Sequence, residues 1–253
     1  MTLTVHQFPC LEDNYGFLIR DDATGLAACI DTPDAGAILE ELQRLGWKLA
    51  LILNTHWHPD HAGGNAEVKA ATGAEVVGPA EVARISALDR EVRGGDEVAL
   101  GETRFQVIES GGHTLGHIAY YDAADHVAFV GDTLFALGCG RLFEGQPDQM
   151  WASLQRLAAL PDDTRVYCAH EYTAANARFA LSVDDDPAVA ARAAEVFAAR
   201  GRGEPTVPTT IGLEKATNPF LRAPKLAGRV GAAGQPDHQA FAAVRAAKDS
   251  FKG

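Results

Sequence analysis

The segment LILNTHWHPDHAGGN, residues 51–65, constrains the fold of this chain more than any other part of the sequence. Its apolar first residues predict a buried strand. Pro59 disfavours helix at His58, so His56 and His58 are expected in a loop at the end of that strand. Asn, Gly or Ser would serve a surface turn at least as well as His does. The high density of His and Asp residues in this segment therefore needs a chemical explanation.

Metal coordination is that explanation. The loop offers imidazole nitrogens and a carboxylate oxygen, which suit zinc, manganese or iron. In a helix His56 and His58 would point to opposite sides, whereas in a loop both rings can converge on one ion. Four donors in one short loop exceed what a single open catalytic zinc usually draws from one segment. We therefore predict that two metal ions share the donors His56, His58, Asp60 and His61.

More donors follow or interrupt later apolar segments. GGHTLGH contains His113 and His117, VGDTLF contains Asp132, and CAHEYT contains His170. The glycines beside them fit a backbone that folds tightly around a site. The spacing leaves open which of His113 and His117 is a ligand, since one of the two can instead support a ligand.

Short apolar segments between Gly, Asp or Pro residues recur through the first two thirds of the chain, and each predicts a strand. Residues 34–46, DAGAILEELQRLG, predict a helix that Asp34 caps and Gly46 ends. Residues 148–160 predict another helix of the same kind. The alternation indicates α/β layers, while the hairpin-like spacing of residues 97–130 argues against a purely parallel sheet.

After Glu171 the sequence changes character. Ala-rich segments with helical spacing follow, and no strand is expected among them. The segment 202–225, rich in Pro and Thr, is longer than an ordinary loop between secondary-structure elements in a compact domain. We therefore predict two domains, residues 1–171 with the strands and donors and residues 172–253 as a helical domain.

The charge and composition exclude several classes of partner. The chain has 253 residues and a formal net charge of −12, which repels nucleic acid and anionic membranes, so an anionic ligand needs a local cationic pocket. No apolar run approaches membrane-spanning length and the N-terminus lacks a secretory pattern, so we expect a cytoplasmic protein. We also expect a monomer. The four cysteines form no C-x-x-C pair and are expected to be free, buried thiols.

The motifs THWHPDH, GGHTLGH, GDTLF and CAHEYT, in this order, resemble the metallo-β-lactamase superfamily. DNYGFLI, GCGRLFEG, HEYT, NPFLR and AVRAAKDSFK extend the resemblance, over nearly the whole chain, to the hydroxyacylglutathione hydrolases, or glyoxalase II. The resemblance implies a four-layered αβ/βα sandwich, the metallo-β-lactamase fold, with a binuclear metal site. It also implies a helical C-terminal domain that completes the substrate pocket.

The resemblance further implies a role for each donor. Asp132 would bridge two divalent ions, zinc in the first place with iron or manganese as alternatives, and His117 would support the ligands. Asp60 and Asp132 would also orient the attacking hydroxide. The implied ligands are His56, His58 and His113 for one ion and Asp60, His61 and His170 for the other.

The implied reaction is hydrolysis of an S-(2-hydroxyacyl)glutathione, S-D-lactoylglutathione above all, to glutathione and a 2-hydroxy acid in methylglyoxal detoxification. Three positions depart from the family pattern, the first being Ala169, which replaces a frequent Gly before His170. Arg141 replaces a frequent Lys, and Phe143 replaces a frequent Tyr, which removes a hydrogen bond worth about 1 kcal/mol. The substrate-binding residues implied by the resemblance are Arg141, Phe143, Tyr172, Arg222 and Lys225.

Other functions compete with this interpretation. An iron-dependent glutathione persulfide dioxygenase would resemble the first domain, but such enzymes generally lack the helical domain with NPFLR. A lactonase or β-lactamase would not need the cations of that motif. A non-catalytic metal-binding module is a third alternative. Structural zinc sites are usually closed and rich in Cys, whereas seven nitrogen and oxygen donors for two ions leave open positions, as catalytic sites do.

Overall fold

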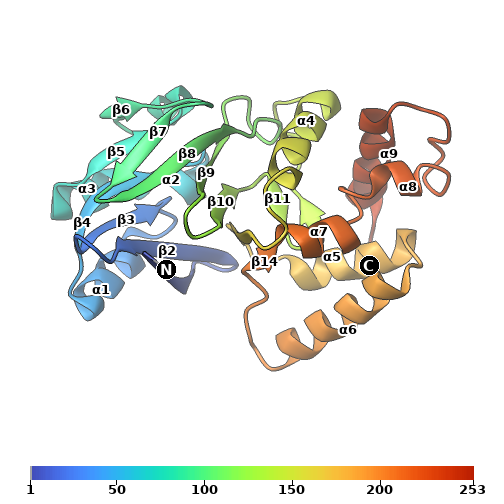
Figure 1. The fold of residues 1–253 in the computed structure, drawn as a ribbon, viewed down its shortest axis with the longest axis horizontal. Helices are drawn as coiled ribbons and strands as arrows, with labels where there is room; N and C mark the ends of the chain where they lie inside the picture. Colours follow the sequence, from blue (N-terminus) through green and yellow to red (C-terminus); the bar gives the residue numbers. More distant parts are fainter. Residues whose placement is uncertain (1) are drawn as a thin grey trace. The chain divides into compact units, whose positions relative to one another are not determined.

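The computed structural model describes residues 2–253, which form two compact units (Figure 1). The first unit runs to Ser110 and includes Gly116–Gly131. The second consists of Gly111–Leu115 and Asp132–Gly253. Within the second unit, helix α4 (Pro147–Ala158) packs on the C-terminal helix α9 (Asp237–Ser250).

The first unit contains a mixed sheet. Strands β1 to β3 pair antiparallel, and β3 to β6 pair parallel. The helices α1 (Ala35–Leu45) and α3 (Asn65–Thr72) bury Ile38, Leu42 and Val68 against this sheet. The strands are, in order across the sheet, β1 (Leu3–Cys10), β2 (Asn14–Asp21), β3 (Leu26–Ile30), β4 (Lys48–Leu53), β5 (Glu75–Gly78) and β6 (Arg90–Glu91).

Helix α1 begins and ends as the sequence predicts. The Asp34 side chain accepts a hydrogen bond from the Ala37 amide at 3.1 Å, which satisfies one of the unpaired amides of the first turn. Gly46 ends the helix with φ of +66°, a conformation that costs glycine little.

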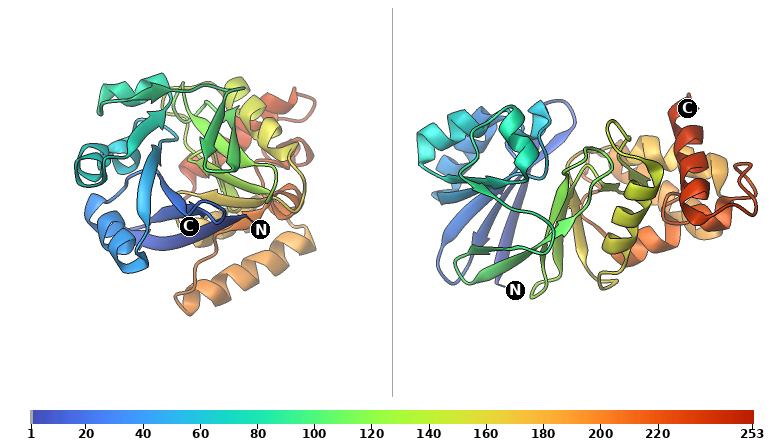
Figure 2. Two further views of the ribbon diagram at one scale, coloured as in Figure 1. Left: turned by 60° about the vertical axis from the view of Figure 1, so that its left-hand side comes forward. Right: turned by 90° about the horizontal axis from the view of Figure 1, so that it is seen from above.

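A second, antiparallel group of strands completes the first unit: β7 (Glu97–Leu100), β8 (Thr103–Glu109), β9 (Ile118–Asp122) and β10 (Val127–Gly131). This confirms the hairpins expected over residues 97–130. Phe17 of β2 lies 5.8 Å from Phe129 of β10, measured between ring centroids, so the two sheets face each other. In Figure 2, right, α1 and α3 lie on the other side of the first sheet, and the unit is layered helix, sheet, sheet.

A buried carboxylate also joins the two sheets. Asp21, at the end of β2, accepts hydrogen bonds from the Thr103 amide and hydroxyl at 3.0 and 2.8 Å. Burial opposes ionisation of Asp21, but the hydrogen bonds from Thr24 and Thr103 lower its pKa to about 2.

The second unit is mainly helical, as predicted after Glu171. Helices α5 and α6 pack through small residues, Ala177, Ala180 and Ala193 among them. The two-residue strand β14 was not expected; it forms by antiparallel pairing with β13. The elements are β11 (Leu134–Phe135), β12 (Gly138–Cys139), α4, β13 (Arg165–Cys168), α5 (Thr173–Val183), α6 (Pro187–Gly201), β14 (Thr209–Thr210), α7 (Ile211–Thr217), α8 (Ala223–Leu226) and α9.

Two expectations from composition can be compared with the described residues. Cys10, Cys29, Cys139 and Cys168 are free and buried, as predicted. Among residues 2–253, no helix has the length and apolarity that crossing a membrane requires.

Candidate metal centre

The loop after β4 gathers the four donors of the THWHPDH motif. His56 and His58 precede the short helix α2 (Pro59–Ala62), which carries Asp60 and His61. The Nε2 atom of His56 lies 3.0 Å from Nδ1 of His58, and Nε2 of His61 lies 3.6 Å from Oδ2 of Asp60. The rings of His56 and His61 are buried with centroids 4.0 Å apart. The non-helical start of the loop thus lets i, i+2 histidines converge, as predicted.

Asp31, at the end of β3, orients two of these rings. Its Oδ2 atom lies 2.8 Å from Nδ1 of His61 and accepts a hydrogen bond from the Thr55 hydroxyl, also at 2.8 Å. The Thr55 hydroxyl in turn lies 3.0 Å from Nδ1 of His56. Because the Nδ1 side of each ring is engaged, Nε2 is the atom turned toward the neighbouring donors.

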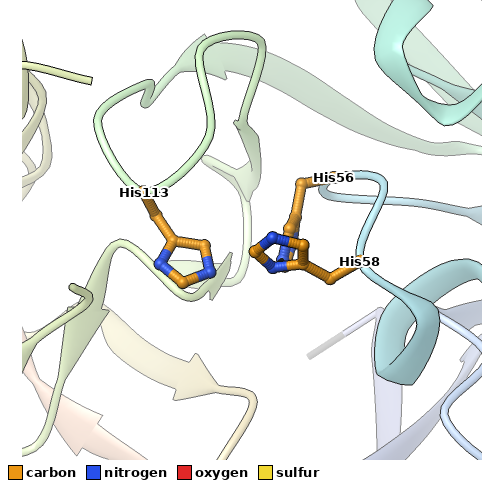
Figure 3. Close-up of side chains that lie close together, drawn as sticks. All are labelled: His56, His58 and His113. Carbon is orange, nitrogen blue, oxygen red and sulfur yellow. Dashed lines mark hydrogen bonds between the residues drawn. The ribbon is translucent and has the colours of Figure 1, made fainter. Parts of the chain in front are cut away.

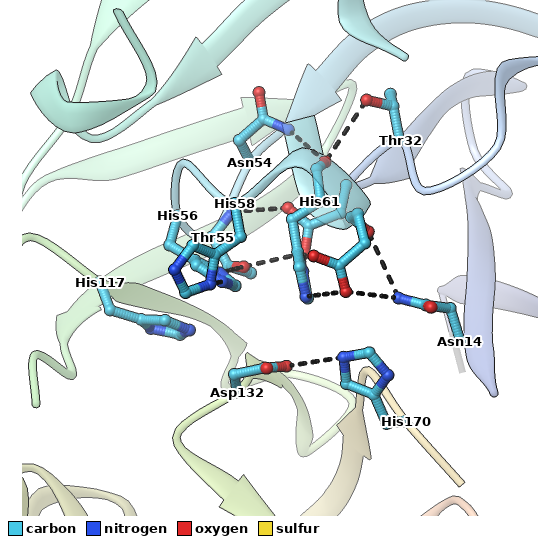
Figure 4. Close-up of polar contacts among 12 residues, drawn as sticks. Asn14, Thr32, Asn54, Thr55, His56, His58, His61, His117, Asp132 and His170 are labelled. Carbon is cyan, nitrogen blue, oxygen red and sulfur yellow. Dashed lines mark hydrogen bonds and ion pairs between the residues drawn. The ribbon is translucent and has the colours of Figure 1, made fainter. Parts of the chain in front are cut away.

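The helix that carries His61 is held from behind as well. The His61 carbonyl accepts a hydrogen bond from the Thr32 amide at 2.6 Å. It also accepts from the Thr32 hydroxyl at 3.3 Å and from Nδ2 of Asn54 at 3.1 Å (Figure 4). Nδ2 of Asn14 lies 3.3 Å from Oδ2 of Asp60. These contacts fix the backbone of α2 and hence the directions of its two donors.

The second unit supplies the remaining donors around Asp132, which follows β10. Its Oδ2 atom lies 3.4 Å from Nε2 of His113. Its Oδ1 atom lies 3.4 Å from Nε2 of His170 (Figure 4). One carboxylate therefore spans two imidazoles, each through a different oxygen. Nδ1 of His113 donates to the Arg141 carbonyl at 2.8 Å, which leaves Nε2 as the atom with a lone pair toward Asp132.

The possible ligand atoms fall into three groups, and within each group they all lie within 4.8 Å of one another. Ligand atoms around one tetrahedral ion lie about 3.4 Å apart, so small side-chain shifts would suffice to bind a metal. Figure 3 shows the first group, in which the three imidazoles point toward one another. The groups are His56, His58 and His113; His56, His61 and Asp132; and Asp60, His61 and His170.

His117 is in none of these groups among the described residues. Its Nδ1 atom lies 2.8 Å from the Ser110 hydroxyl, and its ring stacks on that of His56 with centroids 4.7 Å apart. A ring that packs on a donor, rather than joining it, fits the supporting role that the resemblance implies.

A hollow in the second unit adjoins two of the predicted substrate-binding residues. Arg141 and Phe143 line it, both exposed, together with Arg245 and Asp249 of α9, and its volume is about 370 Å³. Arg245 donates through Nη1 to the Cys139 carbonyl at 3.1 Å, which fixes its side chain. Arg245 also pairs with Asp249 at 2.8 Å, so the local cation that this hollow offers to an anionic ligand is Arg141.

Lys248 adds to the positive charge here. Burial and the nearby guanidinium groups of Arg245, Arg178 and Arg141 lower its pKa to about 8. Arg245 and Lys248 were not among the residues predicted from the sequence, although both lie in the AVRAAKDSFK segment. Their spacing of three residues on a predicted helix was the available signal, because such residues share a face.

Arg222, which the resemblance predicts to grip a ligand carboxylate, does not line this hollow. The side chain is only 8% exposed, and its Nε and Nη2 atoms donate to Asp184 and Asp186 at 2.7 and 2.8 Å. These hydrogen bonds, that of Asp184 above all, raise the pKa of Arg222. The guanidinium is thus bound by the protein's own carboxylates. Lys225, on α8, and Tyr172, just before α5, are exposed.

Comparison with known proteins agrees with this arrangement. The sequence model of the metallo-beta-lactamase superfamily matches residues 24–170, and that of the hydroxyacylglutathione hydrolase C-terminus matches residues 171–251. The curated hydroxyacylglutathione hydrolase of Maricaulis maris (strain MCS10) is 56% identical over 253 residues, which is 98% of this chain and 99% of the relative. The chain belongs to the hydroxyacylglutathione hydrolase family of the metallo-β-lactamase superfamily.

Solved structures confirm the predicted fold class of the family. ETHE1 from Myxococcus xanthus is 29% identical with a TM-score of 0.67, over 97% of this chain and 98% of that one. TTHA1623, solved in a di-iron-bound form, is 26% identical with a TM-score of 0.64, over 86% of this chain and 100% of that one. The metallo-β-lactamase fold and its helical C-terminal region are therefore as the sequence predicts.

Proposed function

We propose that this protein is a metal-dependent hydrolase that cleaves S-(2-hydroxyacyl)glutathione thioesters, S-D-lactoylglutathione in the first place, to glutathione and a 2-hydroxy acid. The observation that carries the proposal is the 56% identity, over 98% of the chain, to a curated hydroxyacylglutathione hydrolase. The match of residues 171–251 to the C-terminal model of the same family supports the hydrolase over the dioxygenase alternative.

We propose that the seven nitrogen and oxygen donors hold two divalent ions. The groups of neighbouring donors support this assignment, as does the carboxylate of Asp132, which reaches two imidazoles through different oxygens. Zinc is the proposed metal, and the di-iron form of TTHA1623 keeps iron as an alternative. The proposed ligands are His56, His58 and His113, then Asp60, His61 and His170, with Asp132 as the bridge.

The bound ions would supply Lewis-acid chemistry and an acidified water. The chain's own residues would do the rest. Asp60, which is partly exposed, and Asp132 would orient the attacking water through their carboxylate oxygens. A thiol has a pKa of about 8.5, so the glutathione thiolate can leave without protonation by a general acid. Asp31 would keep His61 and, through Thr55, His56 in the tautomer that ligates through Nε2.

We propose that the hollow lined by Arg141, Phe143 and Arg245 binds glutathione carboxylates. Glutathione carries two carboxylates and one ammonium, and the chain as a whole has a charge of −12. Binding therefore depends on local cations, here Arg141 with Lys248 nearby. We propose Lys225 and Tyr172 as further contacts. We assign Arg222 to the framework that supports the site, because its guanidinium donates to Asp184 and Asp186.

Hydrolysis of S-D-lactoylglutathione, followed by loss of thioester absorbance with the metal content measured on the same sample, tests the proposal. Rapid turnover with close to two ions per chain is the expected result. Oxygen consumption on glutathione persulfide with a single iron would instead identify the dioxygenase. Bound metal without either activity would leave the non-catalytic metal-binding module.

A further inference from the structure

A buried polar network lies beneath the turn that joins β11 to β12. Glu214 of α7 is completely buried, and its Oε2 atom accepts hydrogen bonds from the Leu137 amide at 2.9 Å and from Nδ2 of Asn218 at 2.8 Å. Its Oε1 atom accepts from the Thr209 hydroxyl at 2.6 Å and from the guanidinium of Arg192. Both oxygens of the carboxylate are therefore engaged, one by the turn and one by the helical framework.

Side chains hold the polar backbone groups along this turn. Asn218 donates through Nδ2 to the Phe135 carbonyl at 3.1 Å and to the Gly138 carbonyl at 2.9 Å. Asn176 of α5 donates to the Ala136 carbonyl at 3.1 Å. Leu137 has φ of +56°, a left-handed conformation that a branched side chain seldom adopts and that the surrounding contacts must enforce.

The turn leads directly into the residues of the ligand hollow. The Gly140 amide donates to the Thr133 carbonyl at 3.2 Å, and a Cβ atom at Gly140 would lie 1.9 Å from the Asp132 carbonyl. The next residue, Arg141, accepts at its carbonyl the hydrogen bond from His113. A shift of the turn would therefore move the backbone of Gly140 and Arg141 away from Thr133 and His113.

We infer that Asn218 and Glu214 position the segment 135–143 and thereby set where Arg141 presents its guanidinium to the ligand. The assignment of Arg141 to a glutathione carboxylate rests on the proposed function; the fixing of the turn does not. A buried ion pair such as Arg192 with Glu214 is weak support for stability by itself, because desolvation offsets the attraction. Here Glu214 of the pair also accepts a hydrogen bond from Leu137 in the strained turn, and that is a reason for the presence of the pair.

Asn218→Ala in the metal-loaded enzyme tests the inference. The substitution removes the donor to two carbonyls of the turn. Thr217→Val is the matched control, because Thr217 lies one residue earlier, is equally buried and bonds to Arg192 and Leu213 but not to the turn. If Asn218→Ala does not fold, Asn176→Ala, which removes the donor to Ala136, replaces it.

We expect Asn218→Ala to raise the KM for S-D-lactoylglutathione about tenfold, since displacement of a charged hydrogen-bond donor costs about this much. A smaller loss of kcat should accompany it, because the Arg141 carbonyl also holds His113. In the Arg141→Ala background the same substitution should raise KM no further, because its effect acts through Arg141. Thr217→Val should lower the melting temperature without changing KM.

Amide hydrogen exchange across residues 134–142 provides a readout that does not depend on the substrate. Asn218→Ala should speed exchange there and Thr217→Val should not. Unchanged exchange in Asn218→Ala, or an equal KM effect with and without Arg141, would overturn the inference. If the wild type hydrolyses no glutathione thioester, the proposed function fails, and the exchange data alone decide whether Asn218 fixes the turn.

Discussion

Replacing Asp31 by Asn should weaken metal binding although Asp31 is not a proposed ligand. The carboxylate makes three contacts: Oδ1 accepts from the Thr55 amide at 2.7 Å, and Oδ2 accepts from the Thr55 hydroxyl and faces Nδ1 of His61, both at 2.8 Å. Asn keeps the oxygen at the first contact and places an amide NH₂ group against the other two. Two contacts that orient His56 and His61 are then lost.

The size of the effect follows from this geometry. Loss of the residues that orient metal-bound histidines typically costs 10- to 100-fold in metal affinity or activity. With both His61 and, through Thr55, His56 affected, we expect a loss of about 100-fold in affinity for zinc. Asp31 has φ of +56°, and Asn tolerates this conformation about as well as Asp, so backbone strain does not confuse the result.

Competition with a chelator, followed as metal content and as hydrolysis of S-D-lactoylglutathione, measures this affinity. Asp34→Asn is the matched control: it removes the same charge three residues away, and Asn caps a helix as well as Asp does. Zinc affinity of Asp31→Asn within twofold of the control would refute the reasoning that Asp31 orients the donors.

Three further predictions follow from the charges of the fold. Lys248, with a pKa of about 8, is a cation below that pH, so the KM for the anionic thioester should rise as the pH increases through about 8. Lys248→Arg keeps the positive charge and should flatten this rise. An unchanged pH profile in the variant would contradict a role of Lys248 in binding. Arg222→Ala should lower the free energy of unfolding by about 3 kcal/mol, because it leaves the buried carboxylate of Asp184 without its partner. The KM should stay nearly unchanged. A raised KM at normal stability would instead assign Arg222 to the ligand site. Asp21 has a folded-state pKa of about 2, below the ordinary 3.8, so its contribution to stability is present above about pH 4 and is lost as the pH falls toward 2. Asp21→Asn lacks this contribution. Denaturant unfolding of the variant should therefore show a shallower loss of stability between pH 4 and pH 2.

The local sequence was sufficient for the parts of the fold that depend on neighbouring residues. Helix α1 runs between a capping Asp34 and a left-handed Gly46, and both signals act within one turn of the chain. The THWHPDH loop was predictable for the same reason. Pro59 restricts the local backbone conformation. The types of donor residue indicate a metal site whatever the rest of the fold is.

Contacts between distant residues decided the rest. The two-residue strand β14 exists only by pairing with β13, more than 40 residues earlier, so its own sequence gave no signal. Asp31 looked like any carboxylate after an apolar segment, and its function became visible only with His61 30 residues away.

The cations make the same point most clearly. Sequence alone identified Arg222 as a candidate for ligand binding because of its motif, whereas the structure places Asp184, 38 residues earlier, against its guanidinium. Arg245, outside the predicted set, lines the hollow with Arg141, and its guanidinium is paired there with Asp249 at 2.8 Å. The sequence determined which charges the protein has. Folding decided which of them are neutralised internally, because an arginine binds whichever carboxylate the tertiary structure brings within about 3 Å.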